Sequence, residues 1–181
     1  YAPDCFRLGE NRVAAPAMDD RCACALLVKL LQTVGETQDT IIAVFSVQEE
    51  VGCRGAKVAS FAKAPDIGIA LDVTGWGDTP GTTQPEIKLG EGIAVKVMDR
   101  GSISNPALRE ALIEAGEQAG VKTQREVLPY GGTDASAMQL SRGGIPVCTL
   151  SIPCRYVHSA CEVIDLRDVD AAKKLLVEYL K

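Results

Sequence analysis

The sequence predicts an α/β fold, with a three-layer α/β/α arrangement around a mostly parallel mixed sheet. Continuous runs of β-branched and apolar residues at 40–47, 66–74 and 145–153 are typical of strands buried on both faces. Segments with helical length and periodicity, such as 22–32 and 105–120, lie between these runs. Strands that alternate with helices favour a layered domain whose sheet is mostly parallel.

Each predicted element rests on its own local pattern. The segment 105–120 has Asn105 as a cap, Pro106 at the first helical position and Gly120 at its end, which indicates a helix. Asp19 and Asp20 are the candidate caps of the first helix. In order along the chain, we expect helices at 22–32, 55–64, 105–120, 133–144 and 165–181, and strands at 40–47, 66–74, 92–99, 122–128 and 145–153.

The composition is that of a single globular domain. The chain has 181 residues, of which 46% are hydrophobic, enough for one sizeable core. The net charge of −5 and the lack of a long basic run argue against a nucleic-acid groove or a patch for anionic membranes. No apolar run is long enough to cross a bilayer, and nothing at the start reads as a signal peptide. The cysteines are expected to be thiols in a reducing cytosol, which favours a cytoplasmic location. The odd count of 7 cysteines, without repeated C-x-x-C, indicates reduced thiols rather than a disulfide framework or a structural zinc site.

Polar residues gather at the ends of the predicted strands. Glu49 and Glu50 follow the strand at 40–47, Asp72 closes the strand at 66–74, and His158 follows the strand at 145–153. Asp19 stands at the start of the first helix. Because ligands of open α/β sheets bind beyond the carboxyl ends of the strands, we expect these side chains at one edge. Carboxylates with an imidazole are typical donors for catalytic zinc, manganese or cobalt, and a two-metal site commonly needs a bridging carboxylate.

The adjacent glutamates suggest two different roles. Within a strand, Glu49 and Glu50 would point to opposite faces. A turn at the strand end, helped by Gly52, would let both reach one site. One carboxylate would hold a metal, and the other would stay free to act as a base.

Ordinary structural explanations remain open for each of these residues. A Glu-Glu pair is commonly part of a solvated turn. Asp19 is explained equally by a helix cap, Asp72 by a turn cap with Thr74, and His158 by a hydrogen bond near the surface. Spacing alone does not decide, because the candidates are scattered along the chain.

Several longer motifs carry a resemblance to a known family. The segments are AMDDRCACALL, VQEEVGCRGA, ALDVTGWGDTPG and GGTDASAMQLSRGGIPVCTLSIPCRYVHSACE. In this order they resemble the tetrahedral (TET) aminopeptidases, also called deblocking or glutamyl aminopeptidases, some of whose relatives are named endoglucanase or cellulase. The resemblance runs from about Asn11 to the end of the chain. The second segment is similar to TVQEEVGLRGA in that family.

The resemblance implies a dinuclear metallo-aminopeptidase that removes N-terminal residues from short peptides. By position, Asp19 corresponds to the ligand shared by two divalent ions, and Glu49 to the general base. Glu50 and His158 correspond to ligands of one ion, and Asp72 to a ligand of the other. The family implies zinc or cobalt, with manganese also possible. It also implies a homo-oligomer for the full-length form.

The chain also departs from the family that it resembles. That family has a further metal-binding histidine in an N-terminal segment and an inserted dimerisation domain. Residues 1–181 are therefore expected to be a catalytic domain without either part, and incomplete relative to that family's domain. Because His158 is the only histidine, the second ion would keep only Asp19 and Asp72 as ligands, which predicts weak binding there and low or absent activity. An exposed sheet edge or apolar face is also expected.

Other nearby residues have less certain assignments. Asp20 stands where the family usually has Asn, and it either strengthens cation attraction or lies in solvent. Arg155 and Tyr156 flank His158 and are candidates to support it, although packing explains them as well. Asp134 is expected to cap the helix that follows it rather than to bind metal, with a place beside the site as the other possibility.

Two further functions compete with the aminopeptidase. One is a non-catalytic remnant that binds peptides or a partner through the same fold. The other is an endoglucanase-type glycoside hydrolase, which would need two carboxyl groups on opposite sides of the scissile bond. The aromatic content of 4% argues against the latter, since sugar-binding surfaces commonly use exposed rings.

Overall fold

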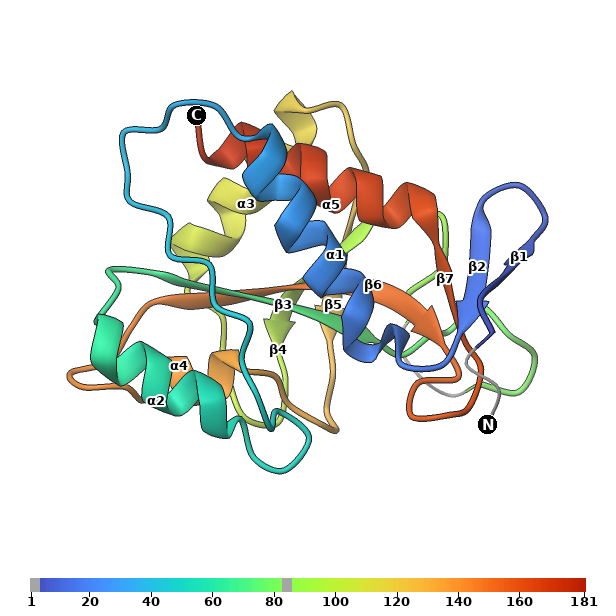
Figure 1. The fold of residues 1–181 in the computed structure, drawn as a ribbon, viewed down its shortest axis with the longest axis horizontal. Coiled ribbons are helices and arrows are strands. Elements are labelled where there is room, and N and C mark those ends of the chain that lie inside the picture. The colour runs from blue at the N-terminus through green and yellow to red at the C-terminus, as the bar shows by residue number, and fades with distance from the viewer. Residues whose placement is uncertain (1–3, 83–85) are drawn as a thin grey trace.

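The fold is a seven-stranded sheet with helices on both faces, seen in a computed structural model that describes residues 4–82 and 86–181 (Figure 1). The strands are β1 (Phe6–Leu8), β2 (Arg12–Ala15), β3 (Gly68–Thr74), β4 (Ile93–Met98), β5 (Thr123–Val127), β6 (Val147–Arg155) and β7 (Glu162–Asp165). The helices are α1 (Met18–Thr33), α2 (Arg54–Lys63), α3 (Pro106–Gln118), α4 (Ala135–Gln139) and α5 (Leu166–Tyr179).

Strand β6 is the centre of the sheet. The strands follow the order β1-β2-β7-β6-β4-β5, and β3 pairs with β6 outside this path. The β3–β6 pairing is parallel and runs from Gly68 opposite Val147 to Thr74 opposite Pro153. Strands β4 and β7 both pair with β6 in the antiparallel sense. The carboxyl ends of β3 and β6 therefore lie together, as the predicted site requires.

The α/β class and the mixed sheet are confirmed, but the prediction of a mostly parallel sheet is wrong. Only β3–β6 and β4–β5 are parallel, whereas β1–β2, β2–β7, β4–β6 and β6–β7 are antiparallel. Strands β1, β2 and β7 were not predicted. Each has only 3 or 4 residues, so none offers the long apolar run by which buried strands are recognised.

Alternation along the central strands divides the core between the two faces. Leu150 and Ile152 of β6 belong to the main cluster, which α1, α3 and α5 cover. Val147, on the opposite face, belongs to a smaller cluster with Ala135 of α4, and α2 packs on α4. Asp72 has the parity of Ala70 in this smaller cluster, so its side chain leaves β3 on the α4 face.

The predicted strand at 40–47 is absent, which is the main error in the predicted elements. The segment 40–47 forms no strand or helix. Phe45 and Val47 are 51% and 65% exposed. A strand needs a neighbour to satisfy its backbone groups, and in the described part of the chain β3 pairs only with β6. The exposed apolar segment agrees with the expected uncovered surface.

No described helix is long and apolar enough to cross a membrane.

Replacing Gly92 with Ala should destabilise the fold. Gly92 has φ +95°, and an added Cβ would overlap the backbone carbonyl of Lys122. We expect the free energy of unfolding to fall by about 2–4 kcal/mol in a denaturant titration. Gly35→Ala is the control, because Gly35 has no atom within 4 Å of an added Cβ. Equal stability of the two variants would contradict this account of Gly92.

The apolar segment should promote self-association. We expect Ile42→Thr with Phe45→Ser to lower concentration-dependent light scattering, because both side chains are exposed in the native protein. The free energy of unfolding should change by less than about 0.5 kcal/mol. Val58→Thr, which changes an exposed valine on α2, is the control for a general loss of surface hydrophobicity. The same decrease in scattering with the control would remove any special role of the segment.

Candidate metal centre

The start of α1 presents two carboxylates in different directions. Asp19 and Asp20 have non-helical backbone angles, so the regular helix begins after them. Of the two candidate caps, Asp20 is the one that acts, because its Oδ1 accepts a hydrogen bond from the backbone N–H of Ala23 at 3.4 Å. The side chain of Asp19 is left to face the sheet edge.

His158 lies in the loop between β6 and β7, in a backbone conformation that a non-glycine residue seldom adopts. Its φ is +63°. Its backbone N–H donates to Oε1 of Glu162 at 2.8 Å. The backbone N–H of Asp19 donates to Oε2 of the same carboxylate at 2.9 Å. Glu162 is only 2% exposed, so one buried side chain fixes both segments.

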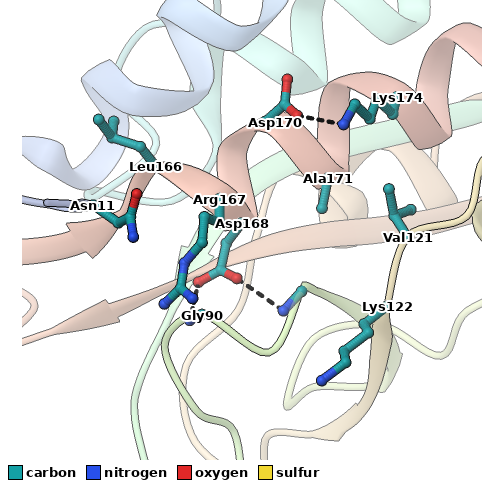
Figure 2. A pocket seen from close by; sticks show the side chains of 11 residues that line it. Asn11, Gly90, Val121, Lys122, Leu166, Arg167, Asp168, Asp170, Ala171 and Lys174 are labelled. Atoms are coloured by element: carbon teal, nitrogen blue, oxygen red, sulfur yellow. Dashed lines mark hydrogen bonds and ion pairs between the residues drawn. The ribbon is translucent and has the colours of Figure 1, made fainter.

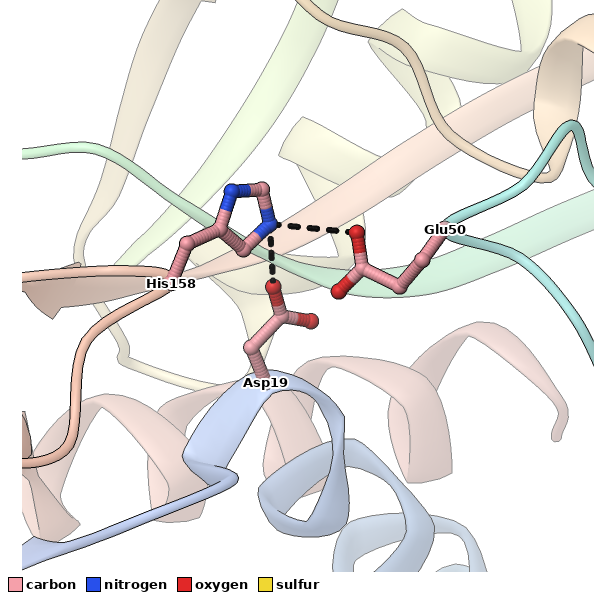
Figure 3. A group of neighbouring side chains, drawn as sticks. All are labelled: Asp19, Glu50 and His158. Carbon is pink, nitrogen blue, oxygen red and sulfur yellow. Dashed lines mark ion pairs between the residues drawn. The ribbon is translucent and has the colours of Figure 1, made fainter.

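Two of the predicted metal ligands, both carboxylates, contact a third, the imidazole of His158. Nε2 of His158 lies 3.1 Å from Oδ2 of Asp19 and 3.2 Å from Oε2 of Glu50. Figure 3 shows the two carboxylates converging on this nitrogen from the start of α1 and from the loop before α2. The side chain of Asp19 is 13% exposed, whereas those of Glu50 and His158 are 59% and 66% exposed. The group is therefore open to solvent on one side.

The fourth predicted ligand lies in a second group that shares Asp19. Oxygen atoms of Asp19, Asp20 and Asp72 all lie within 4.8 Å of one another. Asp72 reaches this group from β3 and accepts a hydrogen bond from the N–H of Val73 at 2.7 Å. Asp20 therefore faces Asp72 rather than open solvent. The structure thus brings together Asp19, Glu50, Asp72 and His158 in two overlapping groups, each able to hold one ion.

Glu49 belongs to neither group. The backbone N–H groups of Gly52 and Cys53 both donate to the carbonyl of Glu49 at 2.9 Å, which forms the turn before α2. The carboxylate of Glu49 lies instead with Cys53 and Asp134, whose candidate ligand atoms are within 4.8 Å of one another. The two neighbouring glutamates therefore do point to different places, as their proposed roles require.

Burial and mutual repulsion raise the pKa values of the carboxyl groups at this centre. Burial, reinforced by Glu50, raises the pKa of Asp19 to about 6, although His158 opposes this shift. Burial, followed by repulsion from Asp72, raises the pKa of Asp20 to about 9. Burial also raises the pKa of Asp72 well above its usual value. Such upward shifts are expected where buried carboxyl groups lie close together with little positive charge nearby.

The donor set fits divalent cations. Among the described residues, His158 is the only basic side chain in ion-pair contact with Asp19 or Glu50. Two carboxylates and an imidazole match the ligands of catalytic zinc, cobalt or manganese. The second group offers oxygen atoms alone, from Asp19, Asp20 and Asp72, so it lacks the imidazole of the first. An added divalent charge would relieve the repulsion in both groups.

The residues flanking His158 hold its loop rather than the imidazole. Arg155 makes a bidentate ion pair with Asp78, with N···O distances of 2.9 and 2.8 Å. The ring of Tyr156 packs edge-on against Trp76 at 5.3 Å. Both contacts tie the end of β6 to the loop after β3. The packing explanation of these two residues is therefore the one that the geometry favours.

Asp134 does not cap α4 with its side chain, so that prediction is wrong. It occupies the N-cap position but makes no side-chain capping bond. Its Oδ2 accepts a hydrogen bond from the hydroxyl of Ser46 instead. Asp134 thus lies beside Glu49, on the edge of the site.

Sequence reasoning missed Glu162 and Cys53. Glu162 stands four positions after His158, at the end of the longest motif, and that position was the available signal. Its function of holding two distant backbone segments depends on β7, which was not predicted. The sequence indicates only a reduced thiol at Cys53, yet its Sγ lies 3.4 Å from Oε1 of Glu49.

A separate hollow of about 430 Å³ lies beside α5, away from these carboxylates (Figure 2). Four of its five charged side chains are in ion pairs: Lys174 with Asp170 at 2.8 Å, Lys122 with Glu91 at 2.8 Å and Arg167 with Asp165 at 2.7 Å. Asp168 accepts hydrogen bonds from the backbone of Gly90 at 2.7 Å. None of the predicted site residues lines this hollow.

Comparisons with known proteins agree on one family. Residues 1–175 match the M42 glutamyl aminopeptidase family. The lysyl aminopeptidase of Pyrococcus furiosus is 44% identical over 188 residues, which cover 100% of this chain and 53% of that protein. The solved structure of aminopeptidase APDkam598 from Desulfurococcus kamchatkensis is 36% identical, with a TM-score of 0.95, and covers 99% of this chain and 51% of that one.

A third similar protein is the TET1 peptidase of Pyrococcus horikoshii, described as able to assemble into a tetrahedron or a large octahedral shell. It is 29% identical with a TM-score of 0.89, and the match covers 99% of this chain and 53% of that one. The present chain therefore spans about half the length of the relatives that it matches. Its family model, its identity to these relatives and its fold agree: the chain belongs to the M42 glutamyl aminopeptidase family.

Proposed function

We propose that this chain carries the catalytic centre of a metal-dependent aminopeptidase, which removes N-terminal residues from short peptides. The observation that carries the proposal is the position of Asp19. It belongs at once to the group with Glu50 and His158 and to the group with Asp20 and Asp72. A carboxylate shared by two neighbouring cation positions is the arrangement that a dinuclear hydrolase needs.

Each side chain has a separate task in this proposal. Glu50 and His158 would hold one divalent ion, and Asp72 the other, with Asp19 between them. Zinc or cobalt suits the first position best, and manganese is also compatible. When bound, such ions polarise a carbonyl group and make water more acidic. Glu49 is left free to take a proton from water and to return it to the leaving amine.

The second ion position is expected to be the weaker one. Its donors in this chain are carboxylates alone, whereas catalytic zinc commonly has three protein ligands that include histidine. The relatives are about twice as long as this chain, and a donor from the additional length would complete the position. We therefore propose that residues 1–181 form a metallopeptidase catalytic domain, and that the full-length protein is a homo-oligomer.

The competing functions have less support. A glycoside hydrolase would need two carboxyl groups facing each other across a sugar, roughly 5–9.5 Å apart. Here Asp19 and Glu50 have carboxylate oxygens within 4.8 Å of each other instead, and both contact the imidazole of His158. A peptide-binding remnant without catalysis would keep the same metal donors, so it would differ from the aminopeptidase only in not hydrolysing peptides. Metal binding without peptide hydrolysis would favour that alternative.

Glu49→Gln should abolish catalysis without removing the metal. We expect the release of chromophore from an aminoacyl anilide, with added zinc, cobalt or manganese, to fall by about 10²–10⁴-fold. The metal content of the purified variant should equal that of the wild type, because Glu49 lies outside both ion groups. A soluble cellulose is the control substrate. Full activity of the variant would remove Glu49 as the base, and cellulose cleavage that survives chelation would overturn the peptidase assignment.

Glu162→Gln should weaken metal binding although Glu162 is no ligand. The amide offers one acceptor oxygen in place of the two that now receive Asp19 N–H and His158 N–H. We expect the metal dissociation constant to rise by about 10–100-fold in equilibrium dialysis. Glu178→Gln, a change on the last turn of α5, is the control. An unchanged dissociation constant would show that the two backbone segments do not need the carboxylate.

Without metal, the stability of the chain should fall as pH rises. The folded-state pKa of Asp19 is about 6 against an ordinary 3.8, and that of Asp20 is about 9, so the folded protein favours their protonated forms. The free energy of unfolding should therefore decrease as pH rises from 3.8 through these values. Added manganese should raise the melting temperature more above the pKa of Asp19 than below it. A shift of equal size at both pH values would contradict this charge account.

A further inference from the structure

We infer that Cys53 is a positioning residue for Glu49, whose thiol holds the carboxylate in the orientation that proton transfer needs. The inference rests on the proposed function only for the role of Glu49. The contact itself is independent of it: Sγ of Cys53 lies 3.4 Å from Oε1 of Glu49.

The hydrogen of the thiol has one preferred acceptor. Besides Glu49, Sγ of Cys53 lies 3.4 Å from the carbonyl oxygen of Thr133 and 3.7 Å from Oγ of Ser136. The Thr133 carbonyl already accepts from the N–H of Ser136 at 3.0 Å and from its hydroxyl at 2.9 Å. Both lone pairs of that carbonyl are therefore engaged. Of the remaining acceptors, the carboxylate is nearer and charged, which favours it over the neutral hydroxyl.

The thiol is also held firmly and stays protonated. Cys53 is 9% exposed and precedes α2 with φ +51°. The backbone N–H of Cys53 donates to the carbonyl of Glu49 at 2.9 Å, so both the backbone and the side chain of Cys53 contact Glu49. Burial, with the nearby carboxylates, raises the pKa of the Cys53 thiol to about 12. The thiol is thus a donor over the whole range in which the protein would work.

The thiol contact restricts a side chain that has few other contacts. Glu49 lies in a turn before α2 and outside the two ion groups. Among the described residues, no basic side chain makes an ion pair with Glu49 within 4.0 Å. A glutamate has three rotatable side-chain bonds and gains rate only when its oxygen faces the reacting proton. A single donor from a fixed neighbour removes part of that freedom.

The direct test is the S–H stretching band in the infrared spectrum of the metal-free protein. The difference spectrum between the wild type and Cys53→Ser isolates this thiol from the other cysteines. We expect Glu49→Gln to move the band to higher wavenumber, because a neutral amide is a weaker acceptor than a carboxylate. The band of Cys148, isolated with Cys148→Ser, is the control, since that thiol lies near the carbonyl of Lys96. A Cys53 band unmoved by Glu49→Gln would overturn the inference.

Kinetics provide the second test. We expect Cys53→Ala to lower kcat by about two- to tenfold, the range of one hydrogen bond, with KM changed less than twofold. Cys53→Ser keeps a donor and should recover most of the rate, which a purely structural role would not predict. Equal losses in the two variants would overturn the inference. If neither the wild type nor any variant hydrolyses anilides when metal analysis finds two ions bound per chain, the proposed function fails, while the infrared result still decides whether the thiol holds Glu49.

Discussion

The site depends on the buried carboxylate of Glu162, which binds two backbone segments at once. Its two oxygens accept the N–H of Asp19 at 2.9 Å and the N–H of His158 at 2.8 Å, although these residues lie far apart in sequence. The side chain is 2% exposed, so both bonds form where water cannot replace them. Because the bonds are made by the backbone, they place the start of α1 and the β6–β7 loop without using the side chains. Those side chains remain free to face the same point.

The charge of the centre follows from this forced proximity. Asp19 is brought close to Glu50 on one side and to Asp72 on the other, and among the described residues His158 is the only basic side chain within ion-pair distance of Asp19. Folding thus holds carboxylates together against their repulsion, and burial raises the pKa of Asp19 to about 6. A fold does not assemble such a cluster for stability, since repulsion between like charges destabilises it. The divalent cation proposed for this centre would offset that repulsion.

The sequence alone predicted the class of fold and the convergence of Asp19, Glu50, Asp72 and His158 better than it predicted the sheet. The helices over α3 and α5 were visible because their caps and periodicity are local. The meeting of Asp19 with His158 could only be expected, because it depends on pairings of β7 with β2 and β6. Those strands are short, and β7 is one of the elements that local pattern could not reveal. Glu162 opens that strand, so its function was hidden with it.

The missing strand at 40–47 shows what actually positions the two glutamates. The apolar run suggested that a strand end would deliver Glu49 and Glu50, but the run pairs with no strand among the described residues. The turn that contains the two glutamates is held instead by hydrogen bonds from residues at the start of α2. The N–H of Gly55 donates to the carbonyl of Val47 at 2.9 Å, and the N–H of Cys53 donates to the carbonyl of Glu49 at 2.9 Å. The start of α2 therefore fixes Glu49 and Glu50, and the preceding segment can stay uncovered without loss of the site geometry.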